Sequence, residues 1–293
     1  MPQRKLFHLR LRSGPLLLGR RTLVMGVLNI TPDSFSDGGK FFDFSSAVDH
    51  ALAMQREGAD LLDVGAESTR PGAADIGANE ELRRLLPVLE GLRRSLKIPI
   101  SVDTRRAIVA EAAIAAGAQI LNDVSGLKHD PQLARIAARH RVPLVLMHMR
   151  GTPATMQKKP FAPNVLRDVT SGLRKSIAIA RKAGVVKSQI ILDPGIGFGK
   201  SFAQNYELLA KLHELAKLGY PLLVGTSRKG FLGATLARDG KLAPSDQRLW
   251  ATAATVTASI LSGAHIVRVH DVAEMAHVAR TADCLLNPNL LGK

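Results

Sequence analysis

The stretch EGADLLDVGAES, residues 57–68, shows a pattern that recurs as AGAQILNDVSG at 116–126 and SGAHIVRVHDV at 262–272. Each copy has a Gly-Ala pair, one polar residue, a short aliphatic run and then polar residues. Glycine commonly ends a helix, and a short aliphatic run is typical of a buried parallel strand. The pattern therefore predicts a repeated unit made of a helix end, a buried strand and a polar loop.

Further strands without the Gly-Ala opening bring the predicted number to eight. They lie at 22–28, 99–102, 143–147, 190–192 and 221–224. The predicted helices lie at 45–57, 79–96, 105–116, 131–140, 165–183, 201–218, 247–262 and 271–284. This alternation predicts an α/β fold, a (β/α)8 TIM barrel, with 21–293 as one domain. Residues 1–20 are expected to form an N-terminal appendage, a β-hairpin that closes the barrel's bottom. A doubly wound open sheet is the alternative, which the strand count disfavours.

Composition narrows the class of protein. The 293 residues are 46% hydrophobic, enough for a sizeable core, and no apolar run approaches the roughly 18 residues of a membrane span. The net charge of +15 would suit an anionic partner, but basic residues are scattered as pairs and aromatics make up only 4%, so platforms for nucleic acid are scarce. The single cysteine, Cys284, cannot form an internal disulfide. We expect a cytoplasmic protein with no nucleic-acid and no membrane partner.

The stretch LDPGIGFGKS, residues 192–201, has the composition of a phosphate-binding loop but not its spacing. The Walker pattern requires glycine at position 194, where the chain has Pro194, which lacks a backbone N–H. A dinucleotide pattern requires a third glycine at position 200, which is Lys200. We therefore expect Lys200 and Ser201 to begin the next helix rather than to bind phosphate.

Polar residues follow each predicted strand. They are Asn29, Glu67 with Thr69 and Arg70, Asp103, Asn122 with Asp123, His148, Asp193, Ser227 with Arg228 and Lys229, and Arg268 with His270. Any one of these Asp or Asn residues is explained by a helix cap. Active sites of such barrels lie at the carboxyl ends of the strands, so the whole set predicts a site at that mouth.

The chemistry of the set indicates its ligand. A carboxylate accepts two parallel N–H bonds, as a 2-amino-4-oxopyrimidine presents them, so Asp103, Asp193 and their neighbours Asn122 and Lys229 suggest a pterin or guanine-like ring. Arg70, Arg268 and His270 would suit an anionic group such as a phosphate. The mouth is thus expected to bind a heterocycle at one end and an anion at the other.

Eight ordered motifs resemble the dihydropteroate synthase family. They are MGVLNITPDSFSDGG (25–39), GADLLDVGAESTRPG (58–72), SVDT (101–104), ILNDVSG (120–126), LMHMRGTPATMQ (146–157), LDPGIGFGKS (192–201), VGTSRKGFLG (224–233) and VRVHDV (267–272). The resemblance runs from about residue 15 to residue 290. It implies condensation of 6-hydroxymethyl-7,8-dihydropterin pyrophosphate with p-aminobenzoate, in folate synthesis.

The resemblance also implies roles for individual residues. Pterin contacts would be Asp103, Asn122, Asp193 and Lys229, with Met147 and Phe198 as apolar walls. Pyrophosphate and Mg²⁺ contacts would be Asn29, Arg70, Arg268 and His270, with Asn29 nearest the metal. The p-aminobenzoate side would comprise Phe35, Thr69, Pro71 and Ser227. A homodimer is implied as well, and so is a target of sulfonamides that mimic p-aminobenzoate, although the sequence does not give the sensitivity to them.

The expected mechanism is dissociative, because the aniline nitrogen is a weak nucleophile. The C–O bond to pyrophosphate would break first, with Mg²⁺ and the basic residues stabilising the leaving group. The stretch TPDSFSDGGKFF, residues 31–42, has the composition of a mobile lid, and its Asp37 would stabilise the cationic centre. The residues given a catalytic role are Asn29, Asp37, Asp103, Lys229, Arg268 and His270.

Some residues have plainer interpretations. His148 faces the mouth or is a satisfied core histidine, and these two interpretations stay open. Trp250 is expected to pack within the fold, and Cys284 to be structural. Gly230 and Trp250 depart from the family's usual residues. Two alternatives are a related barrel that transfers a methyl group from methyltetrahydrofolate to a corrinoid protein, and a basic RNA-binding protein. The motifs at 31–39 and 226–231 argue against the first, and the ordered motifs at the strand ends argue against the second.

Overall fold

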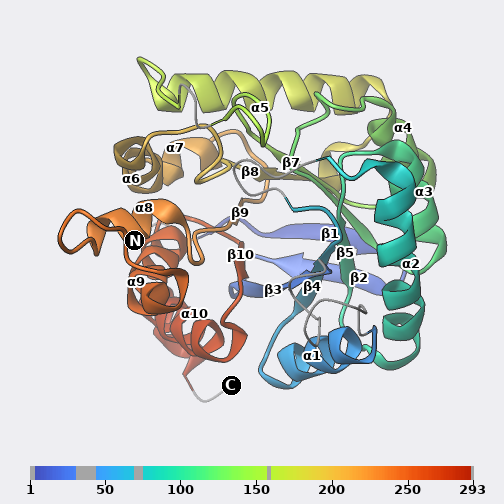
Figure 1. Cartoon of the computed structure of the whole chain (residues 1–293), viewed down its shortest axis with the longest axis horizontal. Coiled ribbons are helices and arrows are strands. Elements are labelled where there is room, and N and C mark those ends of the chain that lie inside the picture. The colour runs from blue at the N-terminus through green and yellow to red at the C-terminus, as the bar shows by residue number, and fades with distance from the viewer. Residues whose placement is uncertain (1–3, 31–43, 69–74, 157–159, 292–293) are drawn as a thin grey trace.

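Eight parallel strands form a closed barrel surrounded by helices (Figure 1). The computed structural model describes residues 4–30, 44–68, 75–156 and 160–291. The barrel strands are β3 (Leu23–Asn29), β4 (Leu61–Gly65), β5 (Ile100–Asp103), β6 (Ile120–Asp123), β7 (Leu144–Met147), β8 (Ile190–Asp193), β9 (Leu223–Val224) and β10 (Ile266–Val269). Their hydrogen-bonded order is β8-β7-β6-β5-β4-β3-β10-β9.

The ring closes between β8 and β9. Leu192 pairs in parallel with Leu222, and the Leu192 N–H donates to the Pro221 carbonyl at 2.9 Å. Closure confirms the predicted (β/α)8 barrel and rules out the doubly wound open sheet, which would leave two free edges.

The helices lie close to their predicted positions. They are α1 (Phe44–Arg56), α2 (Gly77–Ser95), α3 (Ala107–Ala115), α4 (Gln132–His140), α5 (Val165–Lys182), α6 (Phe202–Ala210), α7 (Leu212–Ala216), α8 (Gly230–Thr235), α9 (Leu249–Leu261) and α10 (Val272–Leu286). The helix predicted at 201–218 is broken at Lys211, which caps α6 and precedes α7. The short helix α8 was not predicted.

Side chains along each strand point alternately into the barrel and out toward the helices, and the inward ones form layers. In β4, Leu61 belongs to the apolar cluster inside the barrel, whereas Leu62 and Val64 pack against the surrounding helices. Successive side chains in a strand point to opposite faces, so Asp63 points inward, one layer above Leu61. The same step of two places Asn122 above Ile120 and Asp193 above Ile191. The interior is therefore apolar in one layer and polar in the next, toward the carboxyl ends.

An N-terminal hairpin covers the apolar layer from below, as predicted. Strands β1 (Phe7–Leu11) and β2 (Gly14–Leu18) pair antiparallel, and Leu9, Leu11 and Leu18 join the interior cluster. Arg4 forms an ion pair with Asp283 of α10, whose carboxylate also accepts the Thr22 N–H at 2.6 Å. The amino-terminal end of the barrel is thus closed, and only the carboxyl end is left for a site.

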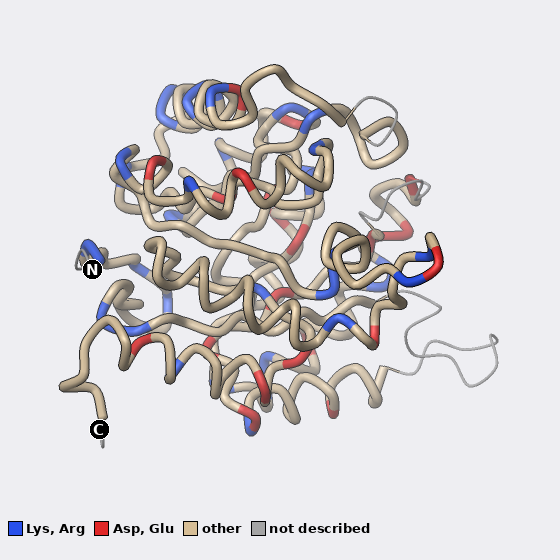
Figure 2. The backbone as a smooth tube through the Cα atoms, turned by 90° about the vertical axis from the view of Figure 1, so that its left-hand side faces the viewer, with Lys and Arg blue, Asp and Glu red and all other residues tan. Residues whose placement is uncertain are grey.

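Basic residues are spread over the molecule, with acidic residues between them (Figure 2). None of the helices in the described ranges is both long and apolar enough to cross a bilayer. The prediction that Trp250 packs within the fold is wrong, because its side chain is 81% exposed. The buried face of α9 runs through Thr252, Val256 and Ser259, and Trp250 lies on the opposite side of the first turn.

Candidate functional site

The strand register brings most of the predicted residues to one level of the barrel mouth. Asn29 pairs with Gly65, Gly65 with Asp103, and Asp103 with Asn122, so these positions are adjacent around the rim. Met147 pairs in the same way with Asp193. Asn29, Asp103 and Asp193 end their strands rather than follow them, which shifts the prediction by one residue without changing the mouth.

Asp63 holds two side chains of the mouth, and the sequence interpretation missed it. Its Oδ2 accepts hydrogen bonds from Arg268 Nε at 2.6 Å and from Asn122 Nδ2 at 2.9 Å. Arg268 also donates to Asp103 Oδ2 at 3.3 Å. Asp63 is fully buried and lies inside an aliphatic run, so reading only the strand ends overlooked it. Its inward place in the period-two alternation was the available signal.

Two buried oxygens of this network point to a missing partner. In the described part of the chain, Asp63 Oδ1 and Asn122 Oδ1 have no hydrogen-bond partner. Buried acceptors left unpaired are costly, and in a functional site they are commonly satisfied by a ligand or water. Both atoms accept hydrogen bonds, so the complementary ligand group is a donor such as an amino group or a ring N–H.

Burial changes the protonation of the carboxyl groups at the rim. It raises the pKa of Asp103 to about 8, assisted by the charge of Asp63 and opposed by Arg268. It raises the pKa of Asp193 to about 6, opposed by the Gly195 N–H, which donates to Asp193 Oδ1 at 2.7 Å, and by Lys229. Asp193 is therefore the more readily ionised of the two carboxyl groups, and burial favours the protonated form of Asp103 more strongly.

Lys229 and Phe198 form the side of the mouth near Asp193. The Lys229 ammonium lies 4.1 Å from the centroid of the Phe198 ring, a cation–π contact. Burial and the neighbouring Arg268 lower the pKa of Lys229 to about 8. Phe198 also packs on an apolar cluster that includes Met147. This side of the mouth presents an apolar face beside a cation, which suits a flat heterocycle.

His270 and Ser227 meet on the other side. The His270 backbone N–H donates to Ser227 Oγ at 3.1 Å, and the same oxygen lies 3.0 Å from His270 Nδ1. Burial and the charge of Arg268 lower the pKa of His270 to about 3, so the ring is neutral at neutral pH. With the Ser227 hydroxyl donating to Nδ1, the ring proton lies on Nε2, where it can donate to an anion.

Other polar residues near the strand ends serve structure. Glu67 pairs with Arg105 and Arg106, and these ion pairs outweigh burial and lower its pKa. Asp123 accepts the N–H groups of Ser125 and Leu127 in a turn. Arg228 pairs with Asp271. The remaining predicted site residues, Phe35, Asp37, Thr69, Arg70 and Pro71, lie outside the described residues.

His148 is a satisfied core residue, the plainer of its two interpretations. It is 5% exposed, and its Nδ1 lies 3.1 Å from the ammonium of Lys200. Burial and the charge of Lys200 lower its pKa to about 2. Ser201 caps α6 with a capping box to Gln204, as the sequence predicts for the start of a helix. Lys200, by contrast, turns inward and is only 1% exposed.

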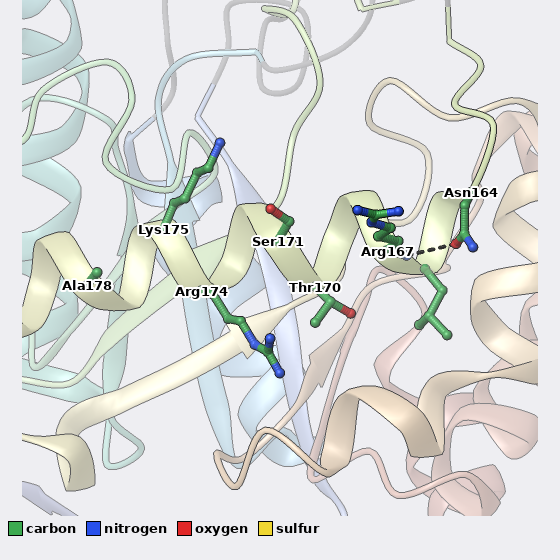
Figure 3. A pocket seen from close by; sticks show the side chains of 8 residues that line it. Asn164, Arg167, Thr170, Ser171, Arg174, Lys175 and Ala178 are labelled. Atoms are coloured by element: carbon green, nitrogen blue, oxygen red, sulfur yellow. Dashed lines mark hydrogen bonds between the residues drawn. The ribbon is translucent and has the colours of Figure 1, made fainter.

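An open groove of about 640 Å³ lies on the outer face of α5, away from the mouth. Its lining residues are Asn164, Leu166, Arg167, Thr170, Ser171, Arg174, Lys175 and Ala178 (Figure 3). All belong to α5 or its N-cap, where Asn164 Oδ1 accepts the Arg167 N–H at 2.9 Å. Side chains from one helix diverge, so the groove is a weaker candidate site than the mouth.

Comparisons with known proteins agree with this geometry. The family described as pterin binding enzyme matches residues 25–270. A dihydropteroate synthase from Synechocystis sp. is 48% identical over 268 residues, covering 91% of this chain and 91% of the relative. A dihydropteroate synthase structure from Clostridium difficile, in the presence of pteroic acid, has a TM-score of 0.85 at 43% identity, covering 92% of this chain and 98% of that chain. One from Xanthomonas albilineans with 4-aminobenzoic acid has a TM-score of 0.85 at 42% identity, covering 92% and 96%.

Proposed function

The chain belongs to the pterin binding enzymes and, among them, to the dihydropteroate synthases, and from that premise we propose how its mouth performs the reaction. The enzyme is a transferase that joins 6-hydroxymethyl-7,8-dihydropterin pyrophosphate to p-aminobenzoate, giving 7,8-dihydropteroate and pyrophosphate. The observation that carries the proposal is the pair of buried acceptors, Asp63 Oδ1 and Asn122 Oδ1, that have no partner among the described residues, in the same mouth as the buried carboxylate of Asp193.

The pterin ring binds between the acceptors and the apolar wall. Asp193, ionised at neutral pH, accepts the 2-amino group and the adjacent ring N–H. Asn122 accepts a further N–H, and Asp103, whose protonated form burial favours, donates to a ring nitrogen. Met147 and Phe198 cover the ring faces, and Lys229 donates to the pterin oxygen. Both substrates are small molecules, in line with the pteroic acid and 4-aminobenzoic acid in the related structures.

The pyrophosphate binds on the side of Arg268 and His270. Arg268 is held by Asp63 and Asp103 and keeps 21% of its side chain exposed toward solvent. Neutral His270 donates from Nε2 without adding charge. Arg70, from the segment outside the described residues, is assigned to the same group. These donors stabilise the negative charge that develops on the leaving oxygen.

Magnesium would be held by Asn29 together with the substrate. Asn29 ends β3 at the rim and offers an amide oxygen, the hard ligand that Mg²⁺ prefers. The described residues contain no cluster of three or more His, Cys, Asp or Glu that could hold a metal alone. This donor set fits Mg²⁺, which usually takes one or two protein oxygens and completes its shell with water and phosphate. When bound, the ion neutralises charge on the pyrophosphate.

The reaction proceeds by cleavage before attack. The C–O bond between the pterin methylene and pyrophosphate breaks, and its electron pair leaves with the oxygen. The resulting positive charge is delocalised over the pterin ring. The carboxylate of Asp193 stabilises that charge. The amine of p-aminobenzoate then forms the new C–N bond and releases a proton to solvent. Ser227 is assigned to the amine side, as are Phe35, Thr69 and Pro71 from the segments outside the described residues. Asp37, which also lies outside them, is assigned to stabilise the cation, and no covalent enzyme intermediate forms.

The enzyme is further proposed to be a cytoplasmic homodimer. Trp250 is 81% exposed, and Leu242 and Leu236 are 49% and 39% exposed in the segment between α8 and α9. Large exposed aromatic side chains are typical of interface centres. The free thiol of Cys284, which has no internal partner in this one-cysteine chain, suits a reducing compartment. Sedimentation velocity of the wild type distinguishes a dimer from a monomer.

The test is product formation. Purified protein is given the pterin pyrophosphate with and without p-aminobenzoate and Mg²⁺, and pteroate and pyrophosphate are measured. We expect product only with all three, and a fall in kcat/KM of about a hundredfold or more in Asp193→Asn. Asp49→Ala, which removes an exposed carboxylate on α1, serves as the matched control and should match the wild type. Pterin binding without product would favour the methyltransferase-like barrel, and no pterin binding would refute the site.

A further inference from the structure

Lys200 is a buried ammonium surrounded by backbone carbonyls. Its Nζ lies 2.8 Å from the Gly195 oxygen, 2.9 Å from that of Phe198 and 3.1 Å from that of His148. An ammonium has three protons and is almost never fully buried unless they are satisfied. None of its hydrogen-bond partners in the described ranges is a carboxylate. The side chain is therefore held by three main-chain oxygens and by His148 Nδ1 rather than by an ion pair.

These carbonyls belong to two neighbouring strand ends. His148 follows β7 directly, whereas Gly195 and Phe198 lie in the loop 194–199 after β8. The loop is pressed against the β7 end. A Cβ on Gly195 would lie 2.0 Å from the His148 oxygen, and one on Gly199 would lie 2.3 Å from the Arg150 oxygen. The lysine thus forms hydrogen bonds across the contact between loop 194–199 and the end of β7. That contact is too close for a side chain at Gly195 or Gly199.

A second side chain holds the same loop from the helix side. Asn205 of α6 accepts the Gly197 N–H at 2.6 Å through Oδ1, and its Nδ2 donates to the Ser201 oxygen at 2.8 Å. Asn205 is uncharged and buried. It therefore provides a natural comparison, because its removal loosens the loop without changing any charge.

We propose that Lys200 is a positioning residue for the pterin pocket, whose ammonium holds loop 194–199 against the end of β7 and thereby orients Asp193 and Phe198. The inference rests on the proposed function of the mouth. Lys200 touches no substrate in this scheme. It acts through the loop geometry and through its positive charge, which lowers the pKa of Asp193.

The charge effect has a defined sign. The groups acting on Asp193 are the Gly195 N–H, Lys229 from the turn after β9, Lys200 itself and Arg268 from β10, and all of them lower its pKa. Removing Lys200 therefore raises the pKa of Asp193 further. Lys200 is charged on the acidic side of its own pKa, which burial lowers to about 7 and which Asp193, Arg150, Asp168 and Lys128 modulate. It is consequently mostly charged at the midpoint of the Asp193 titration and on the acidic side of that midpoint.

The experiment measures binding of 6-hydroxymethylpterin by calorimetry from about pH 5 to about pH 8, on either side of the Asp193 pKa. Lys200→Met keeps the length of the side chain and removes the ammonium. We expect about tenfold weaker binding at neutral pH. We also expect the acidic midpoint, where half of the affinity is lost, to move to higher pH. Lys211→Met, at the exposed end of α6, is the matched lysine control and should bind as the wild type does.

Asn205→Ala separates geometry from charge. It should weaken pterin binding while leaving the acidic midpoint where the wild type has it. A purely structural role for Lys200 predicts the same unchanged midpoint in Lys200→Met, and that result overturns the charge effect. A folded Lys200→Met protein with wild-type affinity overturns the inference altogether.

The remaining outcomes also decide. If Lys200→Met does not fold, as judged by circular dichroism and thermal melting, Asn205→Ala tests the loop, and wild-type affinity there overturns the positioning role. Wild-type protein and Asp193→Asn are measured alongside. If the wild type binds no pterin, the proposed function fails. If the wild type binds pterin and Asp193→Asn weakens the binding, but the Lys200 and Asn205 variants bind as the wild type does, the inference alone fails.

Discussion

At the scale of single residues, Asp63 determines the electrostatics of the mouth. It is a fully buried carboxylate that accepts from both Arg268 and Asn122, so it helps to orient both side chains, and Arg268 donates to Asp103 as well. A buried charge is tolerated only where it is paired and hydrogen-bonded. The position of the arginine that is proposed to bind pyrophosphate is thus set in part by Asp63, whose other oxygen remains available to a ligand donor.

The corresponding prediction concerns Asp63→Ala. Removing one partner of a buried ion pair leaves the other uncompensated, so the free energy of unfolding should fall by about 3 kcal/mol. Urea denaturation measures the change. Asp49→Ala, an exposed position on α1, should change it by less than about 0.5 kcal/mol. Equal stabilities of the two variants would show that Arg268 finds another partner and that Asp63 is dispensable.

The sequence predicted the mouth residues that end a strand but not the one inside it. Asp103, Asn122 and Asp193 stand where an aliphatic run gives way to polar residues, which a linear reading detects. Asp63 is preceded by two leucines and followed by valine, so only the inward direction of its side chain shows that it belongs to the site. That direction depends on which strand face lines the barrel, and the neighbouring strands decide this.

At the scale of elements, the loop after β8 is shaped by a contact rather than by flexibility. Gly195 has a φ of +67° and lies so close to the His148 carbonyl that no Cβ fits. The glycines of LDPGIGFGKS therefore serve the packing of loop 194–199 on the β7 end. This explains why the stretch resembles a phosphate loop in composition while lacking its spacing.

Gly195→Ala should accordingly reduce the stability of the fold by more than the strain of a positive φ alone would. The control is Gly240→Ala, because Gly240 has a φ of +72° and nothing within 4 Å of its Cβ position. Backbone strain of about 1 kcal/mol is common to both variants, and overpacking should add about 1–3 kcal/mol at Gly195 only. Thermal melting compares them. Equal losses of stability would mean that the His148 backbone moves aside at little cost.

The sequence periodicity predicted which segments are helices and which are strands. It did not predict where a helix is broken or where a short extra helix forms. The helix predicted at 201–218 is two helices, because the chain at Lys211 leaves helical geometry with a φ of −103° and a ψ of 17°. No glycine or proline marks that break. The short helix α8 follows Lys229 directly and contains two glycines, a composition that indicates a loop. Tertiary packing overrides local preference in both places.

At the scale of the whole molecule, the hairpin acts as the floor of the barrel. Leu18 is fully buried within the interior cluster, whereas its neighbour Leu17 is 39% exposed. Leu18→Ala should therefore reduce the free energy of unfolding by about 2–5 kcal/mol, and Leu17→Ala by much less. Chemical denaturation of both variants makes the comparison. Similar losses would indicate that the hairpin is an attachment on the barrel and does not contribute to its core.

The ion pair between Arg4 and Asp283 also has a practical consequence. It fastens the start of the described chain to the last long helix, and both ends lie on the same side of the molecule in Figure 2. The mouth, with Asp193 and Arg268, opens at the opposite end of the strands. A fusion partner, affinity tag or sensor-chip linker joined at either terminus therefore leaves the substrate entrance clear. Such a tethered enzyme should turn over as fast as the free one.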